Sequence, residues 1–170
     1  SLVALVSDHG EGLSDHGEPE HGILLYREAL HVPLLLKLPR AARAGTTQAA
    51  PSGLRDVVPT LAKALAVPAP AAAHGRDLLS GAGAESAGVY SETYYPRIHL
   101  GWSELRSLTD GRFHYVDGPK PELFDLAQGP AEKANLLAPD PKRADALPAA
   151  LRALPGGFEA PGAVDPEAAE

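Results

Sequence analysis

The sequence contains no cysteine and no methionine, and only 5% of its 170 residues are aromatic. The absence of cysteine excludes disulfides, thiolate metal ligands and cysteine nucleophiles within these residues. No apolar run approaches the roughly 20 residues that a membrane-spanning helix needs, so no membrane span is expected. The net charge of -7, from 15 basic and 22 acidic residues, argues against a nucleic-acid-binding surface. The chain is nevertheless long enough, and apolar enough, to bury one core.

The first residues have the pattern of a strand, with neither an initiator methionine nor a signal segment before it. Residues 2–6 form a continuous apolar run that stops at Ser7, which is typical of a central strand covered on both faces and followed by a polar loop. We therefore expect the chain to be a piece of a longer protein. The compartment is left open.

The first half of the chain has the pattern of an α/β unit. The spacing of leucine and alanine predicts a helix over residues 23–31, and prolines bound a second apolar strand over residues 32–39. A further helical pattern covers residues 54–67, where Pro59 forces a break or a start. Strand, helix and strand in this order predict the α/β class, with helices packed on a sheet.

The second half has a different pattern, which predicts a small antiparallel sheet. Four short strand-like runs cover residues 88–93, 104–109, 112–116 and 122–126. Asp110 and Gly111 between two of them are a strong signal for a tight hairpin. These patterns divide the chain into an α/β segment (1–85), a small sheet closed by a helix over residues 144–154 (86–154) and a disordered tail (155–170).

The densest group of charged side chains follows the first strand. Carboxylates and imidazoles occupy eight of the fourteen positions from residue 8 to residue 21: Asp8, His9, Glu11, Asp15, His16, Glu18, Glu20 and His21. Such groups are ligands for hard and borderline divalent cations, and the glycines among them let a backbone fold closely around an ion. The alternative is a solvated acidic loop. Position favours the metal site, because Asp8 and His9 lie at a strand end, where α/β sheets bind ligands.

Other candidate residues are less informative. His31 is expected to be structural, whereas His74 and His114 read as inert loop and sheet-surface residues. Residues 94–102 gather aromatic and polar side chains, and they predict either a packed loop under the small sheet or a pocket wall in which Arg97 or His99 binds an anion and Trp102 shapes the pocket. No phosphate-binding loop or dinucleotide fingerprint is present, so nucleotide-cofactor chemistry is not expected.

Several strings of the sequence resemble one known family in the same order. They are residues 5–13, 15–17 and 25–34, followed by residues 55–61, 75–79, 105–115, 122–126 and 135–136. Together they resemble the C-terminal part of the catalytic domain of sulfatases, in the alkaline phosphatase superfamily, over nearly the whole chain to about Leu137. The resemblance implies a sulfatase-like α/β sheet with helices, followed by a small antiparallel β subdomain.

The resemblance also implies an activity and roles for single residues. It implies hydrolysis of a sulfate ester of a small molecule, carbohydrate or lipid, with Asp8 and His9 as ligands of a divalent ion. Calcium is the first expectation for that ion, with manganese, magnesium and zinc as alternatives. His21 falls where many members have a lysine, so it is expected to contact the anion or act as a general acid. His16 is a second catalytic candidate. Because many relatives are exported, the resemblance makes a periplasmic or secreted location plausible.

Two departures from the family pattern leave alternatives open. Many sulfatases have asparagine in place of His9, and an aspartate-histidine pair is equally at home in phosphodiester and phosphonate hydrolases or phosphoryl-type transferases of the superfamily. The Cys/Ser-x-Pro-x-Arg motif, whose first residue becomes formylglycine, is absent and is expected in a preceding N-terminal part. We therefore expect these residues alone to turn over no ester. A non-catalytic module that binds a structural cation is the alternative of another class.

Overall fold

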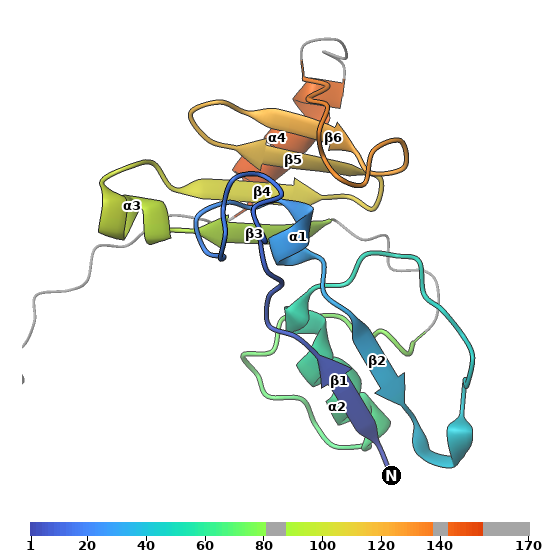
Figure 1. Ribbon diagram of the computed structural model, residues 1–170. Coiled ribbons are helices and arrows are strands. Elements are labelled where there is room, and N and C mark those ends of the chain that lie inside the picture. Colours follow the sequence, from blue (N-terminus) through green and yellow to red (C-terminus); the bar gives the residue numbers. More distant parts are fainter. Residues whose placement is uncertain (81–87, 138–142, 155–170) are drawn as a thin grey trace, which may run out of the picture.

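The computed structural model describes residues 1–80, 88–137 and 143–154, which contain two antiparallel sheets (Figure 1). A two-stranded sheet pairs β1 (Val3–Val6) with β2 (Leu34–Lys37), and a four-stranded sheet has the order β3 (Val89–Thr93), β4 (Leu105–Thr109), β5 (Phe113–Asp117) and β6 (Glu122–Asp125). The helices are α1 (Arg27–Leu30), α2 (Val57–Ala64), α3 (Tyr95–Leu100) and α4 (Arg143–Ala153), with 3-10 turns at Pro39–Ala41 and Leu54–Asp56. The proposed tail lies outside the described residues.

The first strand forms where the sequence predicts it, but it is not buried. All four side chains of β1 are exposed, and Leu5 retains 57% of its accessible surface. β1 pairs along one edge with β2, from Val3 opposite Lys37 to Val6 opposite Leu34. The expectation of a strand covered on both faces is therefore wrong for this structure, because the described residues supply no layer that buries its side chains.

The helix predicted over residues 23–31 is reduced to the single turn of α1. The carboxylate of Glu18 accepts the N–H groups of Ile23 and Leu24, each at 2.8 Å. Both N–H groups are therefore bonded to a side chain of the preceding loop, and the helix begins only after them. At the other end, His31 is extended at φ -89° and ψ 96°. In contrast, α2 tolerates Pro59 because the proline lies in its first turn, where a missing N–H leaves no helical bond unmade.

The second sheet confirms the strand and hairpin predictions within a residue or two. Between β4 and β5, Gly111 adopts a left-handed φ of 102°, and the Asp110 side chain accepts the N–H groups of Arg112 at 3.0 Å and Phe113 at 2.8 Å. α4 likewise confirms the predicted closing helix. Local turn chemistry thus determines the connection.

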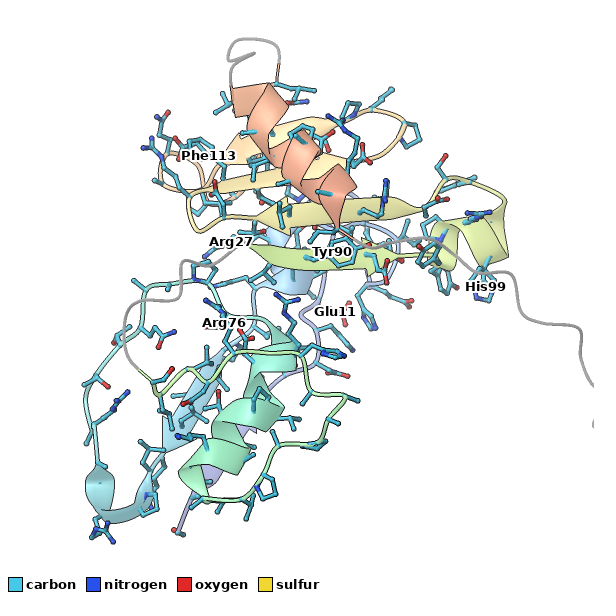
Figure 2. The ribbon with its side chains drawn as sticks, turned by 180° about the vertical axis from the view of Figure 1, so that it is seen from behind. Glu11, Arg27, Arg76, Tyr90, His99 and Phe113 are labelled. Carbon is cyan, nitrogen blue, oxygen red and sulfur yellow. The ribbon has the colours of Figure 1, made fainter. Side chains whose placement is uncertain are left out.

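This sheet lies between two layers. α4 packs on one face, nearest the viewer in Figure 2, where Leu147 and Leu151 meet sheet residues such as Leu123. The segment that leads into α1 covers the opposite face, where Leu25 packs with Val116, Phe124 and their neighbours (Figure 1). The polar loop after β1 is therefore joined, through α1, to the second sheet. No helix in the described ranges is long and apolar enough to cross a membrane.

Candidate functional site

Backbone contacts fix the start of the loop after β1. The N–H groups of Gly10 and Glu11 donate to the carbonyls of Ala29 and Glu28, at 2.8 and 3.1 Å. A Cβ atom at Gly10 would lie 2.0 Å from the Glu28 carbonyl oxygen, so the close approach requires glycine. The backbone beside Asp8 and His9 is therefore held against α1.

Asp8 and His9 have the geometry of two ligands for one ion. His9 Nδ1 lies 2.7 Å from the Gly10 carbonyl oxygen, and because a carbonyl only accepts, Nδ1 carries a proton and Nε2 is the nitrogen that could bind a metal. Asp8 Oδ1 lies 3.8 Å from His9 Nε2. Two atoms bound to one ion can be at most about 5 Å apart, given usual metal-ligand distances. Both side chains are exposed, so the pair can accept an ion from solution.

His21 lies next to this pair. Its ring stacks on the ring of His9, with centroids 3.8 Å apart and planes inclined by 23°. Its Nδ1 atom lies 3.1 Å from the Glu11 carboxylate, which orients the ring, while Nε2 has no hydrogen-bond partner among the described residues. The structure thus brings three of the predicted site residues together: Asp8, His9 and His21.

The rest of the acidic cluster does not complete a metal centre. Glu18 is buried and spends both carboxylate oxygens on backbone N–H groups. Within residues 1–80, 88–137 and 143–154, no three His, Asp or Glu side chains are arranged so as to hold a metal ion. Among the described residues, Asp8 and His9 are therefore two donor groups close enough to contact one ion, without a third beside them.

His16 has a different environment from His21. Its Nδ1 lies 2.5 Å from Glu28 Oε1, its Nε2 lies 3.2 Å from the Glu132 carbonyl oxygen, and its ring stacks on Tyr26 with centroids 3.8 Å apart. No hydrogen bond or ring contact in the described part of the chain joins His16 to Asp8 or His9. With both nitrogens engaged, the ring links α1 to the segment after β6.

The aromatic segment 94–102 forms a short exposed helix, α3, where a packed loop or pocket wall was expected. Thr93 links it to the loop, because its hydroxyl donates to the Gly22 carbonyl and accepts the Tyr95 N–H at 3.3 Å. The start of α3 is thus adjacent to the residue that follows His21. Of the predicted substrate contacts, Arg97 pairs with Glu104 at 3.3 Å, His99 packs on Tyr95 with ring centroids 4.4 Å apart, and Trp102 is exposed.

Comparisons with known sequences identify relatives that act on sulfate esters. No family model matches the chain. Arylsulfatase K of Bos taurus is 28% identical over 91% of the chain, and Delta 4,5-hexuronate-2-O-sulfatase of Bacteroides thetaiotaomicron is 28% identical over 84%. The chain spans 31% of the length of each of these two relatives.

Comparisons with solved structures find proteins of similar fold. A protein solved in complex with its substrate D-glucosamine-2-N,6-O-disulfate has a TM-score of 0.70 at 24% identity, over 89% of this chain and 33% of that one. The chain is similar in sequence to sulfatases, and its fold is similar to that of a solved sulfatase. The phosphonate monoester hydrolase of Agrobacterium radiobacter is also similar, with a TM-score of 0.68 at 26% identity, over 89% of this chain and 34% of that one. The sulfatase-like fold expected from the sequence is confirmed.

Three contacts around α1 are not evident from the sequence. Glu132 joins α1 to the sheet through Arg27 and His114, and the Glu28 side chain contacts His16. The expectation that His114 lies on the sheet surface is wrong. Its side chain is 2% exposed, because it faces the layer formed by the segment leading into α1, and its Nδ1 lies 2.6 Å from Glu132 Oε1. The alternation of side chains between the two faces of β5 places His114 on one face of the sheet, but it does not predict which face is covered.

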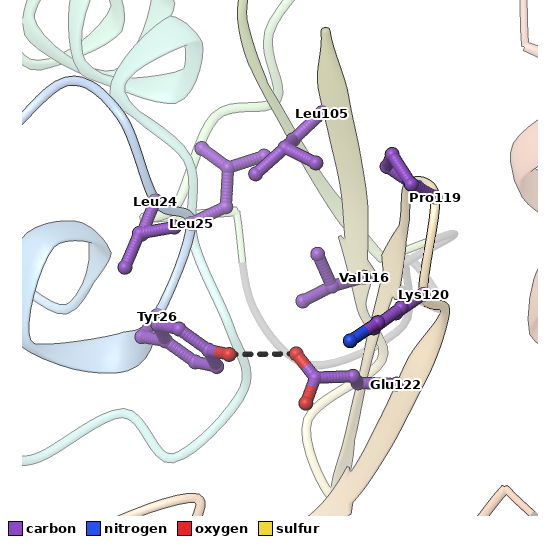
Figure 3. Close-up of a pocket in the computed structure, with 8 residues that line it drawn as sticks. All are labelled: Leu24, Leu25, Tyr26, Leu105, Val116, Pro119, Lys120 and Glu122. Carbon is purple, nitrogen blue, oxygen red and sulfur yellow. Dashed lines mark hydrogen bonds between the residues drawn. The ribbon is translucent and has the colours of Figure 1, made fainter. Parts of the chain in front are cut away.

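A cavity of about 270 Å³ opens between the segment that leads into α1 and the second sheet (Figure 3). Its walls are mostly apolar, with Lys120 and Glu122 on the polar side, and Tyr26 donates its hydroxyl proton to Glu122 at 2.7 Å. Burial, and then the Glu122 carboxylate, raise the pKa of the Tyr26 hydroxyl above its ordinary value. Tyr26 therefore stays protonated and acts as a hydrogen-bond donor across the junction.

Proposed function

We propose that this chain is part of a metal-dependent hydrolase of sulfate esters, to which it contributes half of the ion site. The 3.8 Å separation of Asp8 Oδ1 and His9 Nε2, with the Nε2 lone pair available, carries the proposal. Relatives named as sulfatases support the ester class, and the names hexuronate and glucosamine disulfate favour a sulfated carbohydrate.

Asp8 and His9 would hold a divalent ion. Such an ion supplies positive charge that stabilises the ester oxygens as negative charge develops on them. The carboxylate of Asp8 suits calcium, magnesium and manganese, whereas the imidazole of His9 also accepts zinc. Gly10 supports the pair, since its carbonyl fixes the tautomer of His9 that can bind a metal.

His21 is proposed to bind the anionic ester or to protonate the leaving group. Glu11 accepts the Nδ1–H of its ring, which leaves Nε2 to face a ligand. Because the ring stacks on His9, a group bound to the ion would come within reach of His21. An imidazolium can serve either role near neutral pH. His16, the second candidate, is better placed to orient the loop, since both of its nitrogens are engaged.

Arg97, His99 and Trp102 are proposed to line the substrate side of the site. They lie on or just after α3, whose first turn is tied through Thr93 to Gly22. A guanidinium, an imidazole and an exposed indole suit an anionic substrate with an extended body. The nucleophile, formylglycine in sulfatases, has no candidate in this sequence, so we propose that the chain alone cleaves no ester.

The second candidate function is hydrolysis of a phosphonate or phosphodiester. It is favoured by the phosphonate monoester hydrolases among the structural relatives, at 26% and 27% identity, and by the aspartate-histidine pair. Matched aryl sulfate and aryl phosphonate substrates, assayed with an enzyme that contains this chain, distinguish the two. Faster turnover of the sulfate supports the first proposal, and faster turnover of the phosphonate supports the second.

Metal binding by the chain is tested with Mn²⁺ and NMR, which detects the weak affinity expected of two ligands. Paramagnetic broadening should reach the His9 and His21 rings first. Asp8→Ala should weaken it by about tenfold or more, whereas the matched control Glu20→Ala removes an exposed carboxylate of the same loop and should leave it unchanged. Equal effects of the two variants would assign the binding to diffuse acidic charge and contradict the site.

A further inference from the structure

A buried carboxylate outside the proposed site connects the two halves of the described structure. The side chain of Glu132, in the segment after β6, has no exposed surface. Its Oε1 atom lies 2.6 Å from His114 Nδ1, and its Oε2 atom accepts the Arg27 N–H at 2.7 Å. Burying a carboxylate is unfavourable unless such donors satisfy it, so its place in the fold depends on these contacts.

The Arg27 contact leads directly to the proposed metal ligands. Arg27 is the first residue of α1, and Glu132 therefore anchors the start of that turn. The next two residues of the turn, Glu28 and Ala29, accept the N–H groups of Glu11 and Gly10 through their carbonyls. Gly10 in turn holds the ring of His9. A continuous series of hydrogen bonds thus runs from the Glu132 carboxylate to a metal ligand.

The same segment holds the loop a second time. The Glu132 carbonyl accepts a hydrogen bond from His16 Nε2 at 3.2 Å, and the ammonium of Lys133 donates to the Asp15 carbonyl. His16 also meets Glu28, at 2.5 Å, so it joins the loop to α1 as well as to Glu132. Both series include a contact with α1.

We propose that Glu132 is a positioning residue for the ion site: it fixes the loop that carries Asp8, His9 and His21 against the second sheet, and so sets the affinity of Asp8 and His9 for a divalent ion. The expected effect on metal binding rests on the proposed function. The positioning itself is measurable without any ion, through the protection of the Gly10 and Glu11 amides.

The test compares Glu132→Ala with Glu122→Ala in the full chain. Glu122 is a matched control for the first series, because its carboxylate also reaches across from the sheet, to Tyr26, but bonds to no residue of the series from Arg27 to His9. Glu132→Ala should weaken Mn²⁺ binding by about tenfold or more, as outer contacts of metal ligands do, and Glu122→Ala should not. Glu132→Gln should restore binding, since its amide oxygen can still accept the Arg27 N–H.

Hydrogen exchange separates positioning from general stability. Under conditions where the variants remain folded by circular dichroism, Glu132→Ala should speed exchange at Gly10 and Glu11 and spare the β4–β5 amides. If Glu132→Ala does not fold, His16→Ala replaces it, because His16 is the partly exposed member of the second series. We expect the same faster exchange at Gly10 and Glu11 and the same weaker Mn²⁺ binding. Unchanged exchange and unchanged Mn²⁺ affinity in a folded variant would overturn the inference while leaving the proposed function intact.

The measurements also distinguish the case in which the proposed function fails and the positioning inference holds. If the wild-type chain binds no Mn²⁺, yet Glu132→Ala loosens Gly10 and Glu11 and Glu122→Ala does not, the proposed function fails and the positioning of the loop by Glu132 stands.

Discussion

The two sheets of this chain reverse the usual relation between the composition of a strand and its burial. β1 is wholly apolar, yet all its side chains are exposed. β5 carries a histidine and a tyrosine, yet three consecutive residues, His114, Tyr115 and Val116, are buried. The difference lies in the neighbouring layers, because α4 and the segment leading into α1 cover both faces of the second sheet. Whether a strand is buried thus depends on the layers that pack against it, and its own sequence indicates only a tendency to be buried.

The strongest test of this difference removes a polar group from the covered sheet. His114→Ala leaves the buried Glu132 carboxylate without its imidazole partner, so the free energy of unfolding should fall by about 3–5 kcal/mol. Urea denaturation measures the change. His74→Ala, at an exposed loop position, should stay within about 0.5 kcal/mol of the wild type. Equal effects of the two variants would show that His114 is not held in a buried pair.

The second test makes the same substitution in both sheets. Leu123 has no exposed surface, whereas Leu35 in β2 is 60% exposed. Leu123→Ala should lower the free energy of unfolding by about 2–5 kcal/mol, because it removes buried contacts and leaves a cavity. Leu35→Ala should cost under about 1 kcal/mol, since most of its surface already meets water. A large loss for Leu35→Ala would mean that a layer covers β2 in solution.

The third and smallest effect concerns pH and the edge strand β6. The Arg112 guanidinium hydrogen-bonds to Asp125 and holds the pKa of that carboxyl below its ordinary value. The folded-state pKa is therefore lower than the unfolded-state value of about 4, so the stabilisation is complete above that value and is lost as the pH falls below it. Arg112→Ala should reduce the loss of stability between about pH 6 and pH 3 relative to the wild type.

Lys120→Ala removes an equal charge from the neighbouring hairpin and serves as the control for that measurement. It should keep the wild-type pH dependence, which unfolding at the two pH values will show. An identical change in both variants would assign the effect to net charge and not to the Arg112–Asp125 pair.

Local signals explain which parts of the fold could be predicted. The hairpin follows from Asp110 and Gly111, whose turn chemistry is contained in adjacent residues. α1 could not be bounded, because the competing acceptor for its expected first N–H groups is Glu18, a residue of the preceding loop. The exposure of β1 could not be predicted either, because an apolar pattern does not show whether another layer covers the strand.

The same reasoning applies to the site. Asp8, His9 and His21 are visible in the sequence because they cluster within one loop at a strand end. Glu132 is not visible, because its contact with Arg27 spans 105 positions of the chain and no motif surrounds it. In this chain the sequence pattern thus reveals the proposed ligand-binding residues but not Glu132, which is proposed to position them.

The most direct test of the proposed half-site is the ¹⁵N NMR spectrum of the histidine rings, before and after addition of Zn²⁺. We predict that His9 carries its proton on Nδ1, and that Zn²⁺ shifts His9 Nε2 in the wild type but not in Asp8→Ala. A proton on Nε2 of His9, or a Zn²⁺ response that Asp8→Ala leaves unchanged, would contradict the proposed half-site.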